Sequence, residues 1–411
     1  MKTDIVTVKG IRHGTFCNER NGVKKKTLFP TCMLSTNCGT VPNLSRETYS
    51  YIPVHLHPDV TEVPVQSVID HESIFSSYAG WSGELMRLSK SSLLYVSTQD
   101  PLLSLKTRNK PDAVQNTTKA VSIWGNKGRI ALDVEKHLQL ISTLTPDIFE
   151  VLADGDTIAE DVSNKRVSKS FANSLKFLEQ SLKLHKENER LQDSHFIVPL
   201  EGGNSVELRK KYAISALHLI KENSTIDKCS GFLVDGISPD KPISTHTIDL
   251  VKASLEGLPQ DKPRFIHGAR SPLNVIKLVE CGIDVFDTSF AINLAQKNTA
   301  IVFSIPDSNH NTETKNISTS NGAKFSKFGK NTLDLSDEIY KDSFEPLLKS
   351  CSCYTCTRHT RSYIHHLVSV NELLAPLLLT LHNLHHYLQF FDNLQKAVKA
   401  GSFSEFKSCF S

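Results

Sequence analysis

Short apolar segments alternate with helical patterns from about residue 119 onward, and this alternation is the feature that most constrains the fold. Near-continuous apolar runs are typical of strands that are buried on both faces of a parallel sheet. Helical patterns separate the runs, so the sequence predicts repeated β–α units. The predicted strands are DIFEVL (147–152), HFIVPL (195–200), GFLVD (231–235), RFIHG (264–268), IDVFD (283–287) and TAIVFS (299–304).

The clearest of these units has residues typical of helix ends on both sides of its predicted helix. The segment is SPLNVIKLVECG, in which Ser271 is the expected N-cap and Pro272 the first helical residue. Gly282 closes the helix, and the next strand follows at once. This spacing predicts a tight β–α–β unit.

Six such strands, with more expected upstream, predict an α/β fold of the (β/α)8 barrel type, the TIM barrel. A doubly wound open sheet is the alternative, but no glycine-rich phosphate fingerprint follows any of the strands. In a barrel the carboxyl ends of the strands form the site face. That face is predicted to gather Asp154, Glu201, Asp235, His267 and Asp287.

The flanking regions have other compositions. The first 110 residues alternate turn signals with short apolar runs, which predicts N-terminal β-hairpins. Residues 305–335 are rich in Ser, Thr, Asn and Lys and hold few large apolar side chains. Such a composition cannot bury enough surface to offset its ordering entropy, so a flexible surface insertion is expected.

Composition limits the compartment and the partners only loosely. The net charge is +3, which neither requires nor excludes a nucleic acid. The first residues lack an apolar signal segment, and no apolar run is long enough for a spanning helix. Nine cysteines, unevenly spaced, do not resemble a disulfide framework, so the reducing cytosol is expected.

Three of those cysteines are crowded together as Cys351, Cys353 and Cys356. Thiolates at this spacing can converge on one zinc ion, which needs a fourth ligand. Inert buried thiols are an alternative, and a redox pair is disfavoured because no CxxC begins a helix after a strand. The fourth ligand would come from one of the downstream histidines, His359, His365, His366, His382, His385 and His386.

Together these features predict four parts of the chain. They are an N-terminal β-rich segment with the first barrel elements (1–118), the barrel core (119–304), the insertion (305–335) and a zinc-binding helical subdomain (336–411).

The cysteine segment CSCYTCTRHTRSYIHHL, with LLLTLHNLHHY downstream, resembles the zinc subdomain of tRNA-guanine transglycosylases. The segment DKPRFIHGARSPLNVIKLVECGIDVFD (261–287) is similar to a barrel segment of the same family. Members are TIM barrels that exchange the wobble guanine of tRNA for a deazaguanine. The resemblance implies one structural Zn²⁺ per chain, held by Cys351, Cys353, Cys356 and His382.

The family's catalytic motifs survive only in part. Asp287, in FDTSF, keeps the position of the nucleophile, but the Pro-Thr-Arg segment that seats the anticodon is absent. Residues 122–133 read SIWGNKGRIALD in place of the DSGGFQ loop that carries the acid–base aspartate. The base-recognition motifs are also replaced, by Asp154-Gly155-Asp156, Glu201-Gly202-Gly203 and GFLVDG (231–236).

The resemblance therefore implies the non-catalytic subunit of the heteromeric eukaryotic form, with no catalytic residues of its own. Its expected partners are a catalytic subunit and tRNA, not DNA, and the reaction places queuine at the wobble position of tRNAs with GUN anticodons. The family association implies a cytoplasmic location, peripheral on the mitochondrial outer membrane. The alternatives are an active homodimeric transglycosylase that uses Asp287, and a non-enzymatic zinc or RNA-binding protein.

Overall fold

The structure is a computed structural model whose described residues form two compact units. The first unit contains Met1–Gly39, Asp59–Arg270 and Asn274–Asp287, and the second contains Thr40–Pro58, Ser271–Leu273 and Thr288–Ser411. The described residues are 2–20, 23–78, 80–102, 116–125, 127–155, 157, 162–239, 242–268, 270–305 and 331–410.

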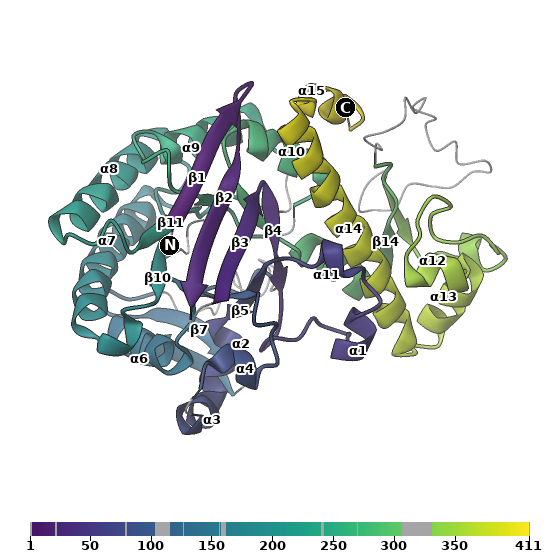
Figure 1. Cartoon of the computed structure of the whole chain (residues 1–411), viewed down its shortest axis with the longest axis horizontal. Coiled ribbons are helices and arrows are strands. Elements are labelled where there is room, and N and C mark those ends of the chain that lie inside the picture. Colours follow the sequence, from purple (N-terminus) through teal and green to yellow (C-terminus); the bar gives the residue numbers. More distant parts are fainter. Residues whose placement is uncertain are drawn as a thin grey trace. The chain divides into compact units, whose positions relative to one another are not determined.

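A closed barrel of parallel strands is the centre of the first unit, as the sequence predicts (Figure 1). The strand order around it is β10-β11-β12-β13-β4-β5-β6-β9, so the sheet closes where β9 pairs with β10. Closure excludes the doubly wound open sheet. The strands are β4 (Thr31–Ser35), β5 (Val60–Pro64), β6 (Leu93–Ser97), β9 (Ile148–Glu150), β10 (His195–Leu200), β11 (Cys229–Val234), β12 (Arg264–Phe265) and β13 (Val285–Asp287).

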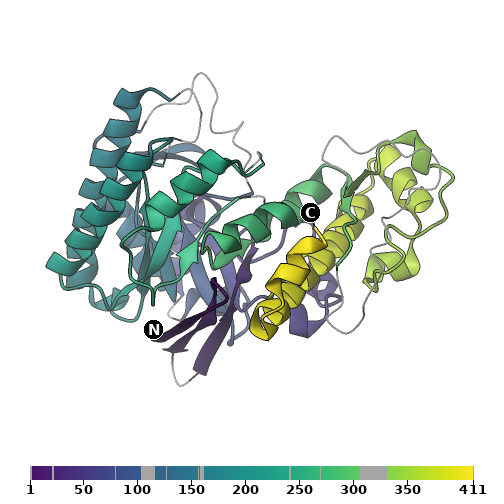
Figure 2. The same cartoon turned by 90° about the horizontal axis from the view of Figure 1, so that it is seen from above.

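Helices follow the strands and surround the barrel, as the view from above makes clear (Figure 2). Ser163 and Ser205 cap two of them through side-chain oxygens that accept the amide protons of Arg166 and Leu208. The helices between barrel strands are α2 (Val65–Val68), η2 (Ile69–His71), α3 (Glu72–Ser77), α4 (Ser82–Leu85), α6 (Val134–Leu144), α7 (Asn164–Glu187), η3 (Glu189–Leu191), α8 (Val206–Glu222), α9 (Thr245–Leu255) and α10 (Pro272–Glu280).

Five of the six predicted strands lie in the barrel, and the sixth does not. The segment 299–304 contributes only β14 (Thr299–Ile301), which pairs antiparallel with β15 (Thr332–Asp334) in the second unit. The prediction is wrong because β13 already pairs with β4 and completes the barrel. The three remaining barrel strands come from the first 118 residues, where the sequence shows no clear β–α rhythm.

An antiparallel sheet of three strands precedes the barrel and confirms the expected hairpins. It consists of β1 (Lys2–Val8), β2 (Ile11–Arg20) and β3 (Val23–Phe29). Phe16 and Phe29 of this sheet belong to one buried cluster with the inward residues at the amino ends of the barrel strands, including Val60, Leu93 and Ile148. These aromatic rings therefore fill the amino end of the barrel, opposite the predicted site face.

The second unit is built mainly of helices. Its long helix α14 (Leu374–Ala400) is buried on all sides in its middle part, where every residue from Leu378 to Leu388 is buried. The other elements are α1 (Arg46–Tyr49), η1 (Val54–Leu56), α11 (Ser289–Gln296), η4 (Glu338–Tyr340), α12 (Tyr354–Arg358), α13 (Arg361–Ser369) and α15 (Phe403–Ser408). Among the helices that the structure describes, none has the length and apolar character that crossing a bilayer requires.

The predicted insertion at 305–335 falls mostly on residues 306–330, which lie outside the described residues. Its last part is described, and there Thr332–Asp334 form strand β15.

A buried ion pair ties the N-terminal sheet to the barrel. The Arg12 guanidinium donates to both carboxylate oxygens of Asp284 at 2.9–3.2 Å, and Asp284 also accepts the amide proton of Arg264 at 2.9 Å. The side chains are 6% and 0% exposed. Arg12 also donates to the backbone oxygens of Gln260 and Lys262, so its charge is fully satisfied.

We expect Arg12→Met to lower the free energy of unfolding by about 3–5 kcal/mol, because Asp284 would remain buried without its cation. Urea denaturation measures this change. Arg129→Met, at an exposed position on β8 (Gly128–Leu132), is the matched control and should stay within about 0.5 kcal/mol of wild type. Equal loss in both variants would contradict the assignment of Arg12 as a structural tie.

Candidate metal centre and barrel mouth

The second unit brings three cysteines and one histidine to a single point. The Sγ atoms of Cys351, Cys353 and Cys356 lie 3.7, 3.4 and 3.3 Å from Nδ1 of His382. All four candidate ligand atoms lie within 4.8 Å of one another. The cysteines come from the turn before α12 and from its first residues, whereas the histidine comes from α14.

This spacing fits a tetrahedral metal ion. With Zn–S near 2.3 Å and Zn–N near 2.0 Å, a sulfur and a nitrogen at the tetrahedral angle are about 3.5 Å apart. The sulfur–nitrogen distances of 3.3–3.7 Å agree with that value. Three thiolates and one imidazole are also a donor set that zinc prefers. The residues present therefore fit the group that the family resemblance implies.

The orientation of His382 is set by a hydrogen bond on the far side of its ring. Nε2 donates to the backbone oxygen of Ile301 at 2.8 Å, which leaves the lone pair of Nδ1 directed at the sulfurs. The next residue, Asn383, accepts the amide proton of Ile301 and donates to the carbonyls of Ala291 and Thr299. The His-Asn pair thus anchors α14 to β14 and α11 while it presents one nitrogen to the cysteines.

The other five candidate histidines do not join the cysteines. His365 and His386 each place a ring nitrogen on a backbone oxygen, that of Leu335 at 2.9 Å and that of Phe303 at 2.7 Å. None of the five belongs to the group of converging ligand atoms found among the described residues. Of the six candidate histidines, His382 is the one that the structure places beside the three cysteines.

Electrostatics at the cluster reflect how tightly its titratable groups are crowded. Hydrogen bonding from Cys351 and Cys356 raises the pKa of the Cys353 thiol, and hydrogen bonding from Cys351 and Cys353 lowers the pKa of Cys356. Burial lowers the pKa of His382, but its contacts with Cys351 and Cys356 outweigh burial and raise it to about 10. The crowding thus favours a thiolate at Cys356, which is the form of cysteine that binds a metal.

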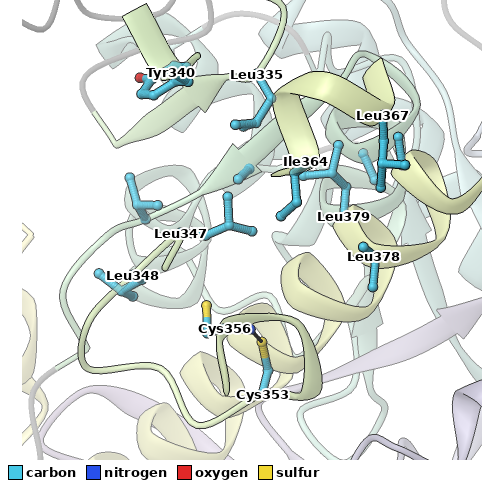
Figure 3. Packing of buried hydrophobic residues seen from close by; sticks show 14 residues of the cluster. Leu335, Tyr340, Leu347, Leu348, Cys353, Cys356, Ile364, Leu367, Leu378 and Leu379 are labelled. Carbon is cyan, nitrogen blue, oxygen red and sulfur yellow. Dashed lines mark hydrogen bonds between the residues drawn. The ribbon is translucent and has the colours of Figure 1, made fainter. Parts of the chain in front are cut away.

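Apolar packing surrounds this cluster. Cys353 and Cys356 belong to a buried group with leucines of the preceding loop and of α13 and α14 (Figure 3). The Thr355 hydroxyl donates to the backbone oxygen of Leu378 at 2.7 Å, which joins α12 directly to α14. The labelled leucines and isoleucine are Leu335, Leu347, Leu348, Ile364, Leu367, Leu378 and Leu379.

In the first unit, the barrel interior has an apolar layer and a polar layer. Residues two apart on a strand point to the same face, so an inward apolar residue is followed by a second inward residue nearer the carboxyl end. The polar layer that results consists of Glu62, Tyr95, Glu150, His267 and Asp287, which follow Val60, Leu93, Ile148, Phe265 and Val285 at a spacing of two.

His267 is at the centre of this polar layer. Its Nε2 lies 2.6 Å from Oε1 of Glu150, and its Nδ1 lies 3.5 Å from Oδ2 of Asp287 and 3.7 Å from Oε1 of Glu62. Glu150 also accepts from the Tyr95 hydroxyl and from the amide and hydroxyl of Thr98. Asp287 accepts the amide proton of Gly268 at 2.6 Å.

Burial and mutual charge move the pKa values of this layer in opposite directions. Burial raises the pKa of Glu62 to about 8, with smaller contributions from Asp287 and Glu150. For Glu150 burial acts in the same direction, but His267 and the hydrogen bonds from Tyr95 and Thr98 outweigh it and lower the pKa. Burial also disfavours the charged form of His267, yet Glu62 and Glu150 raise its pKa well above the ordinary value.

Four of the five residues predicted for the site face follow the carboxyl ends of barrel strands, and Asp287 is the last residue of β13. His267 and Asp287 face each other, and Glu201 lies near Asp235. Asp154 is held by Asn116, Asn173 and the guanidinium of Arg166. Burial raises the pKa of Glu201 well above the ordinary range, and the nearby Asp235 raises it further. Asp235 and His267 line one small cavity of about 50 Å³. Asp156, of the replaced base-recognition motif, lies outside the described residues.

Sequence reasoning missed Glu62 and Glu150 as members of this layer. Glu150 lies inside a run that reads as a continuous apolar strand, and Glu62 lies in the region without a clear rhythm. The signal that could have found them is the shared pattern of an apolar residue two positions before a polar one in five barrel strands.

An eight-stranded parallel barrel accompanied by a helical unit with a Cys3His cluster is thus the class of protein that this chain forms. A family model described as "Queuine tRNA-ribosyltransferase" matches residues 9–411, and the chain belongs to this family.

The chain is also similar to curated relatives over nearly the whole length of both proteins. It is 33% identical to queuine tRNA-ribosyltransferase accessory subunit 2 of Xenopus tropicalis, with 98% of this chain and 97% of the relative covered. It is 32% identical to the human protein of the same name, with 97% and 96% covered, and 30% identical to that of Danio rerio, with 98% and 96% covered.

We expect Glu150→Gln to lower the free energy of unfolding by about 3–5 kcal/mol, because the new amide would face donors and leave the buried His267 without its charged partner. Chemical denaturation followed by circular dichroism measures the loss. Glu179→Gln, on the exposed side of α7, is the control that changes the same chemical group. An unfolding midpoint equal to that of wild type would show that the polar layer does not stabilise the barrel.

Proposed function

We propose that this chain is the non-catalytic subunit of a heteromeric queuine tRNA-ribosyltransferase. In this proposal it supports the exchange of guanine for queuine at the wobble position of tRNAs with GUN anticodons, which are those for Asp, Asn, His and Tyr. Its partners are a catalytic subunit and the tRNA. The similarity to proteins named accessory subunit 2, over almost the full length, supports a subunit role.

The burial of Asp287 is the observation that carries the non-catalytic part of the proposal. A nucleophilic carboxylate must reach the ribose carbon with its attacking oxygen about 3–3.5 Å away. The Asp287 side chain is 0% exposed, and its Oδ2 accepts the amide proton of Gly268 and lies beside His267. The adjoining cavity of about 50 Å³ is far below the size of ligand pockets, roughly 300 Å³ or more.

The segment that the family resemblance places at the acid–base loop supports the same proposal. In this part of the chain β7 (Val121–Gly125) pairs antiparallel with β8 (Gly128–Leu132), and the sequence has no aspartate between Val121 and Leu132. Loss of a general acid–base group costs a factor of about 10²–10⁴ in rate. A chain without this group, and with its remaining aspartate buried, is suited to holding a partner and tRNA rather than to reaction.

We also propose that Cys351, Cys353, Cys356 and His382 hold one structural Zn²⁺. Four protein ligands would close the coordination sphere, so the ion would crosslink α12 to α14 and offer no position to a substrate. A tRNA-holding role would rest on lysine and arginine contacts with phosphates, whose strength falls as salt rises. The cytoplasmic location and the peripheral attachment to the mitochondrial outer membrane stay predictions from the family resemblance.

Exchange of labelled queuine into tRNA tests the subunit role. We expect no exchange by the purified chain, none by the catalytic subunit alone, and exchange by the two together. Asp287→Asn in this chain should leave the rate of the pair within about twofold, whereas the nucleophile substitution in the catalytic subunit should abolish it.

Two other outcomes would replace the proposal. If this chain alone carried out the exchange, and Asp287→Asn abolished it, the alternative of an active homodimer that uses Asp287 would replace the proposal. No exchange in any combination with a catalytic subunit would favour a zinc or RNA-binding protein outside the reaction.

Metal analysis tests the zinc proposal. We expect Cys353→Ser to lower the zinc content by one ion per chain and to unfold the helical unit at a lower temperature than wild type, since structural zinc contributes folding free energy. Cys409→Ser, outside the cluster, is the control that should keep the ion. Full zinc content in Cys353→Ser would contradict the ligand assignment.

A further inference from the structure

The polar layer of the barrel contains a second point at which ligand atoms converge. Oε1 of Glu62, Nδ1 of His267 and Oδ2 of Asp287 all lie within 4.8 Å of one another. The side chains of Glu62 and Asp287 are 0% exposed, and that of His267 is 14% exposed. No thiol takes part, so this point differs in chemistry from the cysteine cluster.

The hydrogen bond between His267 and Glu150 determines which ring nitrogen faces this point. The 2.6 Å contact between Nε2 and Oε1 of Glu150 fixes a proton on Nε2, so Nδ1 is the ring nitrogen that would exchange its proton for a metal ion. A carboxylate behind the histidine is the usual partner of a metal-bound imidazole. His382 has the same arrangement in the cysteine cluster, with a carbonyl oxygen in place of the carboxylate.

Two of the three facing atoms lack hydrogen-bond partners among the described residues, namely Oε1 of Glu62 and Nδ1 of His267. The other oxygen of Glu62 accepts from the Ser35 hydroxyl at 3.1 Å, so the orphan atom is the one aimed at His267. At 3.7 Å the two atoms are too far apart for a hydrogen bond. A metal ion at this point would give both buried atoms a partner, and buried polar atoms without a partner are costly.

We propose that Glu62, His267 and Asp287 bind a divalent transition-metal cation inside the barrel. With metal–ligand distances near 2.1 Å, tetrahedral ligand atoms are about 3.4 Å apart, close to the 3.5 and 3.7 Å found between His267 and the two carboxylates. One imidazole nitrogen and two carboxylate oxygens suit zinc or manganese.

Such an ion would join strand β5 to β12 and β13 across the mouth, and Glu150 would attach β9 through His267. The inference goes beyond the proposed function and does not depend on it, because it concerns the barrel of the isolated chain.

Mn²⁺ is the probe of choice for the test, because oxygen and nitrogen ligands suit it while thiolates select zinc. The full chain, with zinc supplied to its cysteine cluster, is titrated with Mn²⁺, and free Mn²⁺ is followed by electron paramagnetic resonance. We expect one Mn²⁺ per chain, and Glu62→Gln should weaken its binding at least tenfold. Glu179→Gln is the control and should bind as wild type does.

Metal content by mass spectrometry covers the case in which the purified chain already carries the ion. Wild type would then hold two divalent ions per chain, Glu62→Gln one and Glu179→Gln two. If Glu62→Gln fails to fold, Asp287→Asn takes its place in both measurements. Absence of both bound Mn²⁺ and a second resident ion in wild type would overturn the inference, as would equal binding in wild type and a folded ligand variant.

Discussion

The alternation of side chains along each barrel strand is the constraint on which the rest of this structure depends. Because inward positions recur every second residue, each strand of two to six residues can contribute only one to three side chains to the interior. The amino-end positions are apolar and meet Phe16 and Phe29 of the N-terminal sheet. The carboxyl-end positions are then polar in five strands, and they are brought together because the strands are parallel and closed.

A single principle orients the key imidazole in both units. In each case one ring nitrogen hydrogen-bonds to a fixed oxygen, and the other nitrogen faces a cluster of anionic or potentially anionic groups. His382 uses the carbonyl of Ile301 and faces sulfur, whereas His267 uses the carboxylate of Glu150 and faces oxygen. The fixed oxygen is charged for His267 and neutral for His382. Electrostatic attraction therefore holds His267 more strongly, whereas backbone geometry holds His382.

The sequence was sufficient for the fold class and for five barrel strands, because buried parallel strands and capped helices leave strong local patterns. It was insufficient for β4, β5 and β6, whose neighbours are short helices and loops rather than one long helix. It also assigned TAIVFS to the barrel, since an apolar run does not reveal whether its partner is parallel or antiparallel. Choosing His382 among six histidines required either the family resemblance or the packing of α14 against β14.

The environment of Asp287 supports the proposal that this chain is the non-catalytic subunit. Catalysis by a carboxylate needs an oxygen that is exposed to substrate and a base nearby that can exchange protons. Here His267 lies beside Asp287 but is itself held by Glu150, and Glu150 is held by Tyr95 and Thr98. Each group that could donate or accept a proton is thus held in place by a contact with the next group in this series. The charges that would serve a reaction in an open site instead hold five strands of the barrel in one register.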